Sequence, residues 1–261
     1  MNKRSVTIAI IFVLVGTVLM FYSPDWLTLV MIGIMLSLLL CTFIYCILRI
    51  ERFTDGFRSA RKQIERSREI ESDSQVNYIL QQEALFYEHT LDTLFADFKQ
   101  EYKKQKESDG YAVSIEDMID EDTLALFTNQ EPASQISGML TGIGLLGTFT
   151  GLITGISNIG FSSVTTAVSS LQLLLAGIRT SFYSSIAGVI LSLILTIILR
   201  VEWTRMLTGL HLFYRDFHAQ IIPSSEFQMR KQEAAYRKQV LMMLRKREGE
   251  DGEDEQDEQE E

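Results

Sequence analysis

Small and hydroxyl-bearing side chains follow one another along an uncharged segment, residues 138–159, with the sequence GMLTGIGLLGTFTGLITGISNI. The segment is long enough to cross a bilayer. Small residues let helix backbones approach closely in a membrane, and hydroxyls there need a polar partner or water. A helix of this composition is therefore predicted to contact protein or water instead of lipid.

Helical spacing collects these residues on one face. At about 100° per residue, five of them fall within an arc of roughly 80°. They are Thr141, Gly144, Thr148, Gly151 and Gly155. On the next span, residues 176–199, a similar face covers roughly 120°. It comprises Gly177, Ser181, Ser184, Ser185, Gly188 and Ser192. Close packing of two helices would explain such faces, but several hydroxyls on each also indicate a path for ions.

Neither face carries an acidic residue. Because serine and threonine do not titrate near neutral pH, a proton path along them needs a carboxylate from elsewhere. The predicted path-lining residues are Thr141, Thr148, Thr180, Ser181, Ser184 and Ser185. The predicted helix-packing residues are Gly144, Gly147, Gly151, Gly155 and Gly188. Arg179 falls roughly opposite the serine face, where it could form an outer ion pair, reach the membrane interface, or act in gating.

Two further apolar runs, residues 5–22 and 26–48, are joined by a short turn that contains Pro24. The first run is longer than the core of a secretory signal and ends without a small-residue cleavage site, which favours a membrane hairpin. Ser23 or Asp25 is the expected cap of the second helix, with Trp26 at the interface. The sequence thus predicts an all-α, polytopic membrane protein with four transmembrane helices and helical cytoplasmic extensions.

Basic residues predict the orientation. They crowd the segment after the second span, at Arg49, Arg52, Arg58, Arg61, Lys62, Arg66 and Arg68. Lys3 and Arg4 precede the first span, and Arg200 and Arg205 follow the last one. By the positive-inside rule, both termini are expected in the cytoplasm.

The region between the second and third spans has apolar residues at helical spacing from Val76 to Phe98. Ser114 and Asp117 form a capping-box-like pair at the start of a short helix. We expect this insert to be too thin for a core of its own, and the third span to begin after a break at Pro132. The predicted divisions are a hairpin (1–50), the insert (51–132), the channel helix pair (133–200), a helical tail (201–247) and an acidic disordered tail (248–261).

Other chemistry has little support in the sequence. Cys41 and Cys46 lie five residues apart in an apolar span, which matches neither a redox pair nor a metal site. The three histidines lack ligand spacing. The sequence contains no nucleotide loop or nucleophile elbow. We therefore expect no enzyme and no cofactor, only a translocated H⁺ or Na⁺. The net charge of −10 comes mostly from the solvated tail.

Two motifs resemble a known family, the MotA/TolQ/ExbB channel subunits of bacterial energy-transducing motors. GIGLLGTFTGL, residues 142–152, resembles the first family motif, and LAGIRTSFYSSIAG, residues 175–188, resembles its partner on the next helix. The resemblance covers about fifty residues directly, and the topology of insert, short outer loop, last span and tail matches the rest. Members associated with phage defence also resemble the second motif.

The resemblance implies a ring of several copies, five by analogy, around two copies of a single-span partner (MotB/TolR/ExbD-like) that carries the ion-binding aspartate. Thr148 matches the path-lining threonine, and Ser185, with Ser184 beside it, matches the hydroxyl of the second motif. Thr180 stands where TolQ and ExbB members have a glutamate. The implied function is an ion-driven motor channel, with flagellar torque, outer-membrane transport, gliding and phage defence all open.

Two other classes remain possible. A non-conducting membrane scaffold would use the small faces only for packing and the cytoplasmic helices to recruit partners. A transporter with its own substrate site is less favoured, because no inverted repeat, broken helix or intramembrane carboxylate is visible.

Overall fold

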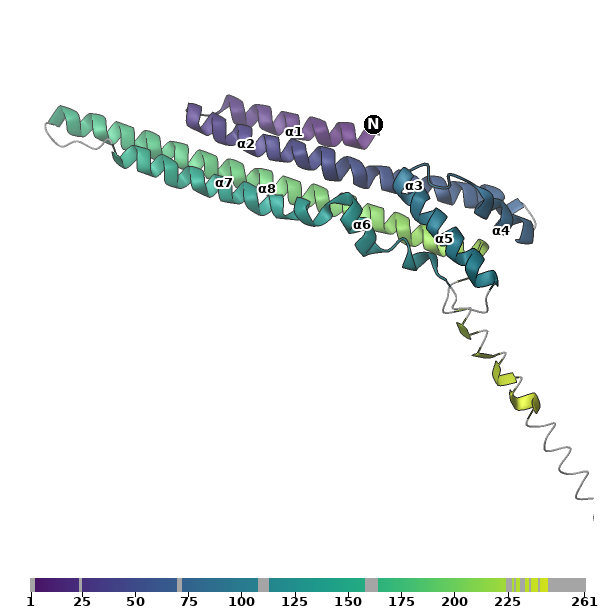
Figure 1. The fold of residues 1–261 in the computed structure, drawn as a ribbon. Coiled ribbons are helices and arrows are strands. Elements are labelled where there is room, and N and C mark those ends of the chain that lie inside the picture. The colour runs from purple at the N-terminus through teal and green to yellow at the C-terminus, as the bar shows by residue number, and fades with distance from the viewer. Residues whose placement is uncertain are drawn as a thin grey trace, which may run out of the picture. The chain divides into compact units, whose positions relative to one another are not determined.

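The computed structural model describes residues 3–23, 25–69, 72–107, 113–157 and 164–223, with residues 227, 229–230, 233–234, 236–238 and 240–243. All regular elements within these residues are helical, which confirms the predicted all-α class (Figure 1). The helices are α1 (Lys3–Phe21), α2 (Trp26–Thr42), the π-helix η1 (Phe43–Ile47), α3 (Leu48–Arg66), η2 (Ser67–Glu69), α4 (Ser72–Gln81), α5 (His89–Glu107), η3 (Ile115–Asp117), α6 (Glu121–Thr128), α7 (Gln130–Ser157) and α8 (Val164–Gln220).

Four helical segments in the described part of the chain are long and apolar enough to cross a membrane, as predicted. The chain divides into two compact units. Unit 1 comprises residues 1–58 and 120–211, and unit 2 comprises residues 59–119 and 212–261. The outer loop falls largely on residues 158–163, and the acidic tail on 248–261; both lie outside the described residues.

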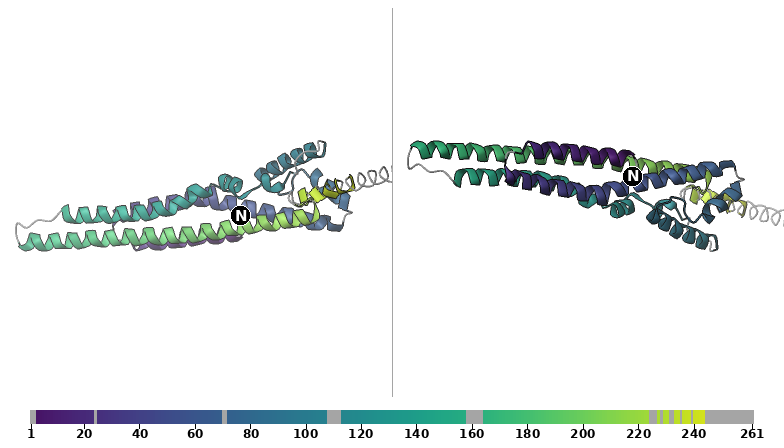
Figure 2. Two further views of the ribbon diagram at one scale, coloured as in Figure 1. Left: turned by 90° about the horizontal axis from the view of Figure 1, so that it is seen from below. Right: turned by 90° about the horizontal axis from the view of Figure 1, so that it is seen from above.

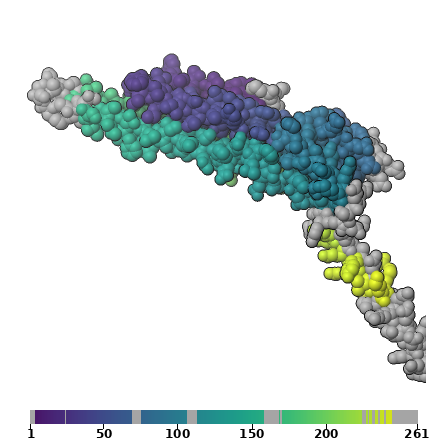
Figure 3. Space-filling model, in the orientation of Figure 1, coloured from purple at the N-terminus to yellow at the C-terminus, as the bar shows by residue number. Residues whose placement is uncertain are grey.

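In unit 1, α1 and α2 form the predicted hairpin. Asp25 is the N-cap of α2, and Trp26 is its first residue. Beyond the end of α2, Phe12 of α1 packs against Phe43 of η1, with ring centroids 6.2 Å apart in an edge-to-face arrangement. In the space-filling view of Figure 3 the purple hairpin lies along the teal surface of α7. The hairpin is therefore a support for the channel helix pair.

Helix α7 begins earlier than expected. Asn129 ends α6 in the left-handed conformation, with φ 52°, and α7 starts at the next residue. Pro132 thus lies inside the first turn of α7, so the prediction of a break at Pro132 was wrong. A proline is tolerated there because the first backbone N–H groups of a helix have no intrahelical acceptor. The break is instead made by the left-handed residue.

Unit 2 has an aromatic core that the sequence did not lead us to expect. The core joins the insert to the end of α8, and its rings are Phe86, Phe95, Phe98, Phe213 and Phe217. Arg61 on α3 donates to Asp216 on α8 at 2.7 Å. The insert by itself is too thin for a core, as expected, but α8 supplies the other half of the core. The predicted cap at Ser114 and Asp117 is confirmed, with the Ser114 N–H 3.2 Å from the Asp117 carboxylate.

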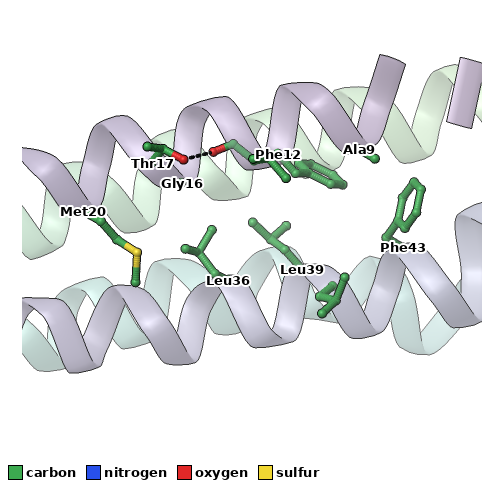
Figure 4. A pocket seen from close by; sticks show the side chains of 10 residues that line it. Ala9, Phe12, Gly16, Thr17, Met20, Leu36, Leu39 and Phe43 are labelled. Atoms are coloured by element: carbon green, nitrogen blue, oxygen red, sulfur yellow. Dashed lines mark hydrogen bonds between the residues drawn. The ribbon is translucent and has the colours of Figure 1, made fainter. Parts of the chain in front are cut away.

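An apolar pocket of about 330 Å³ lies between α1 and α2 (Figure 4). Phe12, Leu36 and Leu39 line it. Its one hydroxyl, on Thr17, donates to the carbonyl of Val13 at 2.7 Å. A single hydroxyl among otherwise apolar lining residues does not make an ion site, so the candidate chemistry remains on α7 and α8.

Candidate functional site

The small faces of α7 and α8 meet each other directly. The two helices run side by side in both views of Figure 2. A Cβ atom added at Gly177 would lie 2.5 Å from the Gly151 carbonyl oxygen, and one added at Gly188 would lie 2.9 Å from Gly144 Cα. Glycine is needed at these positions because the two backbones are in contact. We call this contact the glycine seam; it contains Gly144, Gly147, Gly151, Gly155, Gly177 and Gly188.

Two of the predicted path residues are part of the glycine seam. Ser181 is 2% exposed, and its hydroxyl donates to the carbonyls of Thr148 (2.8 Å) and Gly177 (2.9 Å). Ser184 is 1% exposed and donates to the Ser181 carbonyl at 3.0 Å. Both hydroxyls already have partners within the chain. This placement differs from the expectation that they line a conduit, since the neighbouring backbone covers them.

Thr180 points to another element. It is 6% exposed, and its hydroxyl donates both to the carboxylate of Asp25 and to the Ala176 carbonyl, the latter at 3.1 Å. Three residues later, the Tyr183 hydroxyl donates to the Leu19 carbonyl at 2.7 Å. This side of α8 therefore faces the α1–α2 turn. Thr180 was predicted to line the path with the serines, and the structure instead directs it toward the hairpin.

Thr141, Thr148 and Ser185 lie on the opposite side, which we call the open face. Gly147 faces α2, because a Cβ atom added there would lie 3.7 Å from Met31 Sδ. Thr148 is rotated from Gly147 by about 100°, and Ser185 from Thr180 by about 140°, so both turn away from the hairpin. Thr141 is exposed, whereas Thr148 and Ser185 are half-buried.

The sequence analysis missed two members of this row. The Thr196 hydroxyl donates to the Ser137 hydroxyl at 3.0 Å, which links α8 to α7 at the end near Arg200. Ser137 lies four residues before Thr141, and Thr196 lies eleven residues after Ser185, so each is rotated by only about 20–40° from an open-face residue. This helical spacing was the signal that could have found them.

The hydroxyls of α7 on the open face are held by their own helix. Thr148 Oγ1 donates to the Leu145 carbonyl at 2.5 Å, and Thr141 Oγ1 donates to the Ser137 carbonyl at 3.3 Å. Each hydroxyl donates its one hydrogen to a carbonyl in a hydrogen bond. Its oxygen lone pairs therefore remain available to accept from water or to coordinate a cation. The open face can therefore offer oxygen ligands but cannot take up a proton.

Arg179 is exposed, and it forms no ion pair with the residues that the structure describes. It is the only basic residue between Glu131 and Arg200. A six-residue offset turns Arg179 about 120° away from Ser185, so it lies off the open face, where its guanidinium can reach the membrane interface.

A family model described as the anti-phage protein ZorA of the Zorya type I system matches residues 21–218. The match includes α2, the insert and both channel helices. No curated protein matches the chain.

Proposed function

Because the chain belongs to the ZorA-like family of anti-phage proteins, we propose that it is the channel subunit of an ion-driven membrane motor in a phage-defence system. ZorA is a channel of the MotA/TolQ/ExbB kind, which agrees with the resemblance of the two motifs. In this role the chain converts a transmembrane gradient of H⁺ or Na⁺ into mechanical work. Each charge that crosses contributes about 2.3 kcal/mol per 100 mV.

The open face is the observation that carries this proposal. Thr148 and Ser185 present oxygen ligands on the side of α7 and α8 that the hairpin leaves uncovered. The lone pairs of these hydroxyl oxygens can accept from water or coordinate a cation, so a wet or polar surface against this face would find ligands there. The glycine seam holds the two helices together, so that both present hydroxyls on this one side.

A partner must complete the path. The sequence has no aspartate or glutamate between Glu131 and Glu202, so the channel helices carry no group that binds a proton near neutral pH. We propose that a single-span partner subunit lies against the open face and supplies this carboxylate. In the proposed assembly five copies of the chain surround two copies of the partner, in the inner membrane, with both termini in the cytoplasm.

The scaffold alternative has one specific observation in its favour. The glycine seam uses most of the small residues and seals Ser181 and Ser184, as a purely structural contact would. In that case the chain would hold its neighbours together without conducting ions, and the open face would pack dry against another helix.

Reconstitution distinguishes the two functions. The full chain is purified in a mild detergent together with the single-span protein of the neighbouring gene, and placed in liposomes with either a pH gradient or a sodium gradient. We expect the two proteins to copurify and cations to cross. A chain that purifies without any single-span companion, and that passes neither cation, would favour the scaffold and contradict the proposal.

A further inference from the structure

The apolar pocket between α1 and α2 is a groove that is open along one side of the hairpin (Figure 4). Both helices belong to unit 1 and are long and apolar enough to cross a membrane. The floor of the groove is buried and includes Phe12 on α1 and Leu39 on α2. Its rims are exposed, with Val13 at 68% and Leu40 at 59%. The groove is therefore accessible sideways from the surrounding membrane.

Small side chains on α1 create the groove. Ala9 and Gly16 line it seven residues apart, which places them on nearly the same side of the helix. The two helices touch at Gly16, because a Cβ atom added there would lie 2.8 Å from Leu36 Cδ2. The rings of Phe12 and Phe43 make a second contact, with centroids 6.2 Å apart. These contacts hold the hairpin together, and the small residues leave space beside them.

The length of the groove matches one leaflet of a bilayer. On α1 it extends from Ala9 to Met20, about 16 Å at 1.5 Å per residue, and one leaflet contributes about 15 Å of hydrocarbon. Ala9 lies five residues from Arg4, and Phe43 lies six residues from Arg49, so the groove begins about 7–9 Å inside these basic residues. With both termini in the cytoplasm, as proposed, the groove extends from the cytoplasmic leaflet to about the centre of the bilayer.

The lining of the groove suits a hydrocarbon and not a polar ligand. Its one hydroxyl, on Thr17, already donates to the Val13 carbonyl at 2.7 Å. Apolar cavities stay dry and take apolar ligands. A volume of about 330 Å³ spread over about 16 Å of helix leaves no room for another helix, which is about 10–12 Å across with its side chains. The groove therefore fits a single flexible hydrocarbon chain.

The charges beyond the cytoplasmic end of the groove suit a phosphate headgroup. Arg4, Arg49 and Arg52 lie at this level. Glu51, which lies between two of them in sequence, accepts from the buried Ser5 hydroxyl, and its other carboxylate oxygen is buried as well. The carboxylate thus faces the protein and leaves the guanidinium groups to bind phosphate.

We propose that the groove binds one acyl chain of a phospholipid from the cytoplasmic leaflet, with the lipid phosphate next to the arginines. The bound chain fills the space beside Gly16 and completes the packing of the hairpin. Because the surrounding lipid is as apolar as the groove, the preference for the groove comes from van der Waals contacts on several sides of the chain. The inference goes beyond the proposed function and does not depend on ion conduction.

Photolabelling with a lipid tests the inference. The full chain, with any single-span partner that copurifies, is placed in vesicles of phosphatidylethanolamine and phosphatidylglycerol. A small fraction of the phosphatidylglycerol carries a photoactivatable diazirine on one acyl chain. After illumination, mass spectrometry of the peptides locates the label along α1 and α2.

Leu40 and Leu14 are the matched positions for this measurement. Leu40 lines the groove and is 59% exposed, whereas Leu14 is not among the lining residues and is 60% exposed. Leu40 lies nine residues from Arg49 and Leu14 lies ten residues from Arg4, so the two have similar depth in the membrane. We expect the label on Leu40 to exceed that on Leu14 by about threefold or more, because a chain held in the groove stays against its wall.

Two variants with the same new residue separate binding in the groove from passing contact. Ala9→Phe fills the groove, and is expected to lower the label on Leu40 to the level on Leu14. Ile10→Phe changes the neighbouring residue, which is 57% exposed and rotated by about 100° from Ala9, and is expected to leave the label on Leu40 unchanged.

The outcomes decide the inference whether or not the complex conducts ions. Equal labelling of Leu40 and Leu14 in the wild type overturns it, and so does an unchanged label on Leu40 in an assembled Ala9→Phe complex. If Ala9→Phe does not assemble, the comparison of the two leucines in the wild type decides alone. A wild type in which Leu14 is labelled and Leu40 is not would show that protein covers the groove, which also overturns the inference.

Discussion

Replacing Gly177 by alanine is expected to separate α7 from α8 and to reduce the stability of the chain by about 1–3 kcal/mol or more. The new methyl group would lie 2.5 Å from the Gly151 carbonyl oxygen and 2.8 Å from Gly155 Cα. Both atoms belong to the backbone of the facing helix, which cannot turn aside as a flexible side chain can. The measurements are the thermal unfolding of the detergent-purified chain and the yield of assembled oligomer.

Gly142→Ala is the matched control for this prediction. Gly142 lies on α7, and a Cβ atom added there would meet nothing within 4 Å. Alanine has the higher helix propensity, so the control should be as stable as the wild type or slightly more stable. Equal unfolding temperatures for the Gly177 and Gly142 variants would show that α7 and α8 do not form the glycine seam in the membrane.

Replacing Thr148 by valine and Ser185 by alanine is expected to reduce ion flux through the assembled complex at least tenfold. Each change removes a hydroxyl from the open face without adding bulk. A cation or water molecule that loses one oxygen partner in an apolar environment loses about 1–3 kcal/mol, and about 1.4 kcal/mol corresponds to a factor of ten in rate. The measurement is flux in liposomes, together with phage protection in cells.

Thr150→Val is the control for the flux measurement. Thr150 lies two residues from Thr148 on α7, is rotated from it by about 200°, and donates to the Leu146 carbonyl at 2.8 Å. The same chemical change is therefore made away from the open face. If the Thr150 and Thr148 variants conduct equally, the flux does not follow the open face, and the assignment of Thr148 fails.

The sequence was sufficient for the four spans and for the small faces of α7 and α8, because apolar length and helical spacing are properties of a single helix. It was not sufficient to predict which residues of each small face lie in the glycine seam and which lie on the open face. An arc of roughly 120° on α8 included both Ser184, which is sealed in the seam, and Ser185, one residue away on the open side. Only the position of the facing backbone separates the two, and that position depends on tertiary packing.

Contacts distant in sequence were also beyond prediction. Asp25 could be read as a helix cap from its place before Trp26, but nothing local indicates that its carboxylate bonds to Thr180. The core of unit 2 was missed for the same reason, since Phe213 and Phe217 come from α8, far from the insert that they complete. At Pro132 a local signal was present but misleading. Proline usually breaks a helix, but it is tolerated in the first turn, where it lies here.

The central claim is that ions follow the open face and not the glycine seam, and cysteine labelling tests it most directly. Cys41 and Cys46 are first replaced by alanine, and single cysteines are then placed at Thr148, Ser185 and Ser184 in the complex with the partner. We predict that a small cationic, water-soluble thiol reagent modifies the cysteines at 148 and 185 and blocks the flux, and leaves the one at 184 unmodified until the protein is denatured. Modification at 184 in the folded complex, with 148 and 185 protected and the flux intact, would contradict the account.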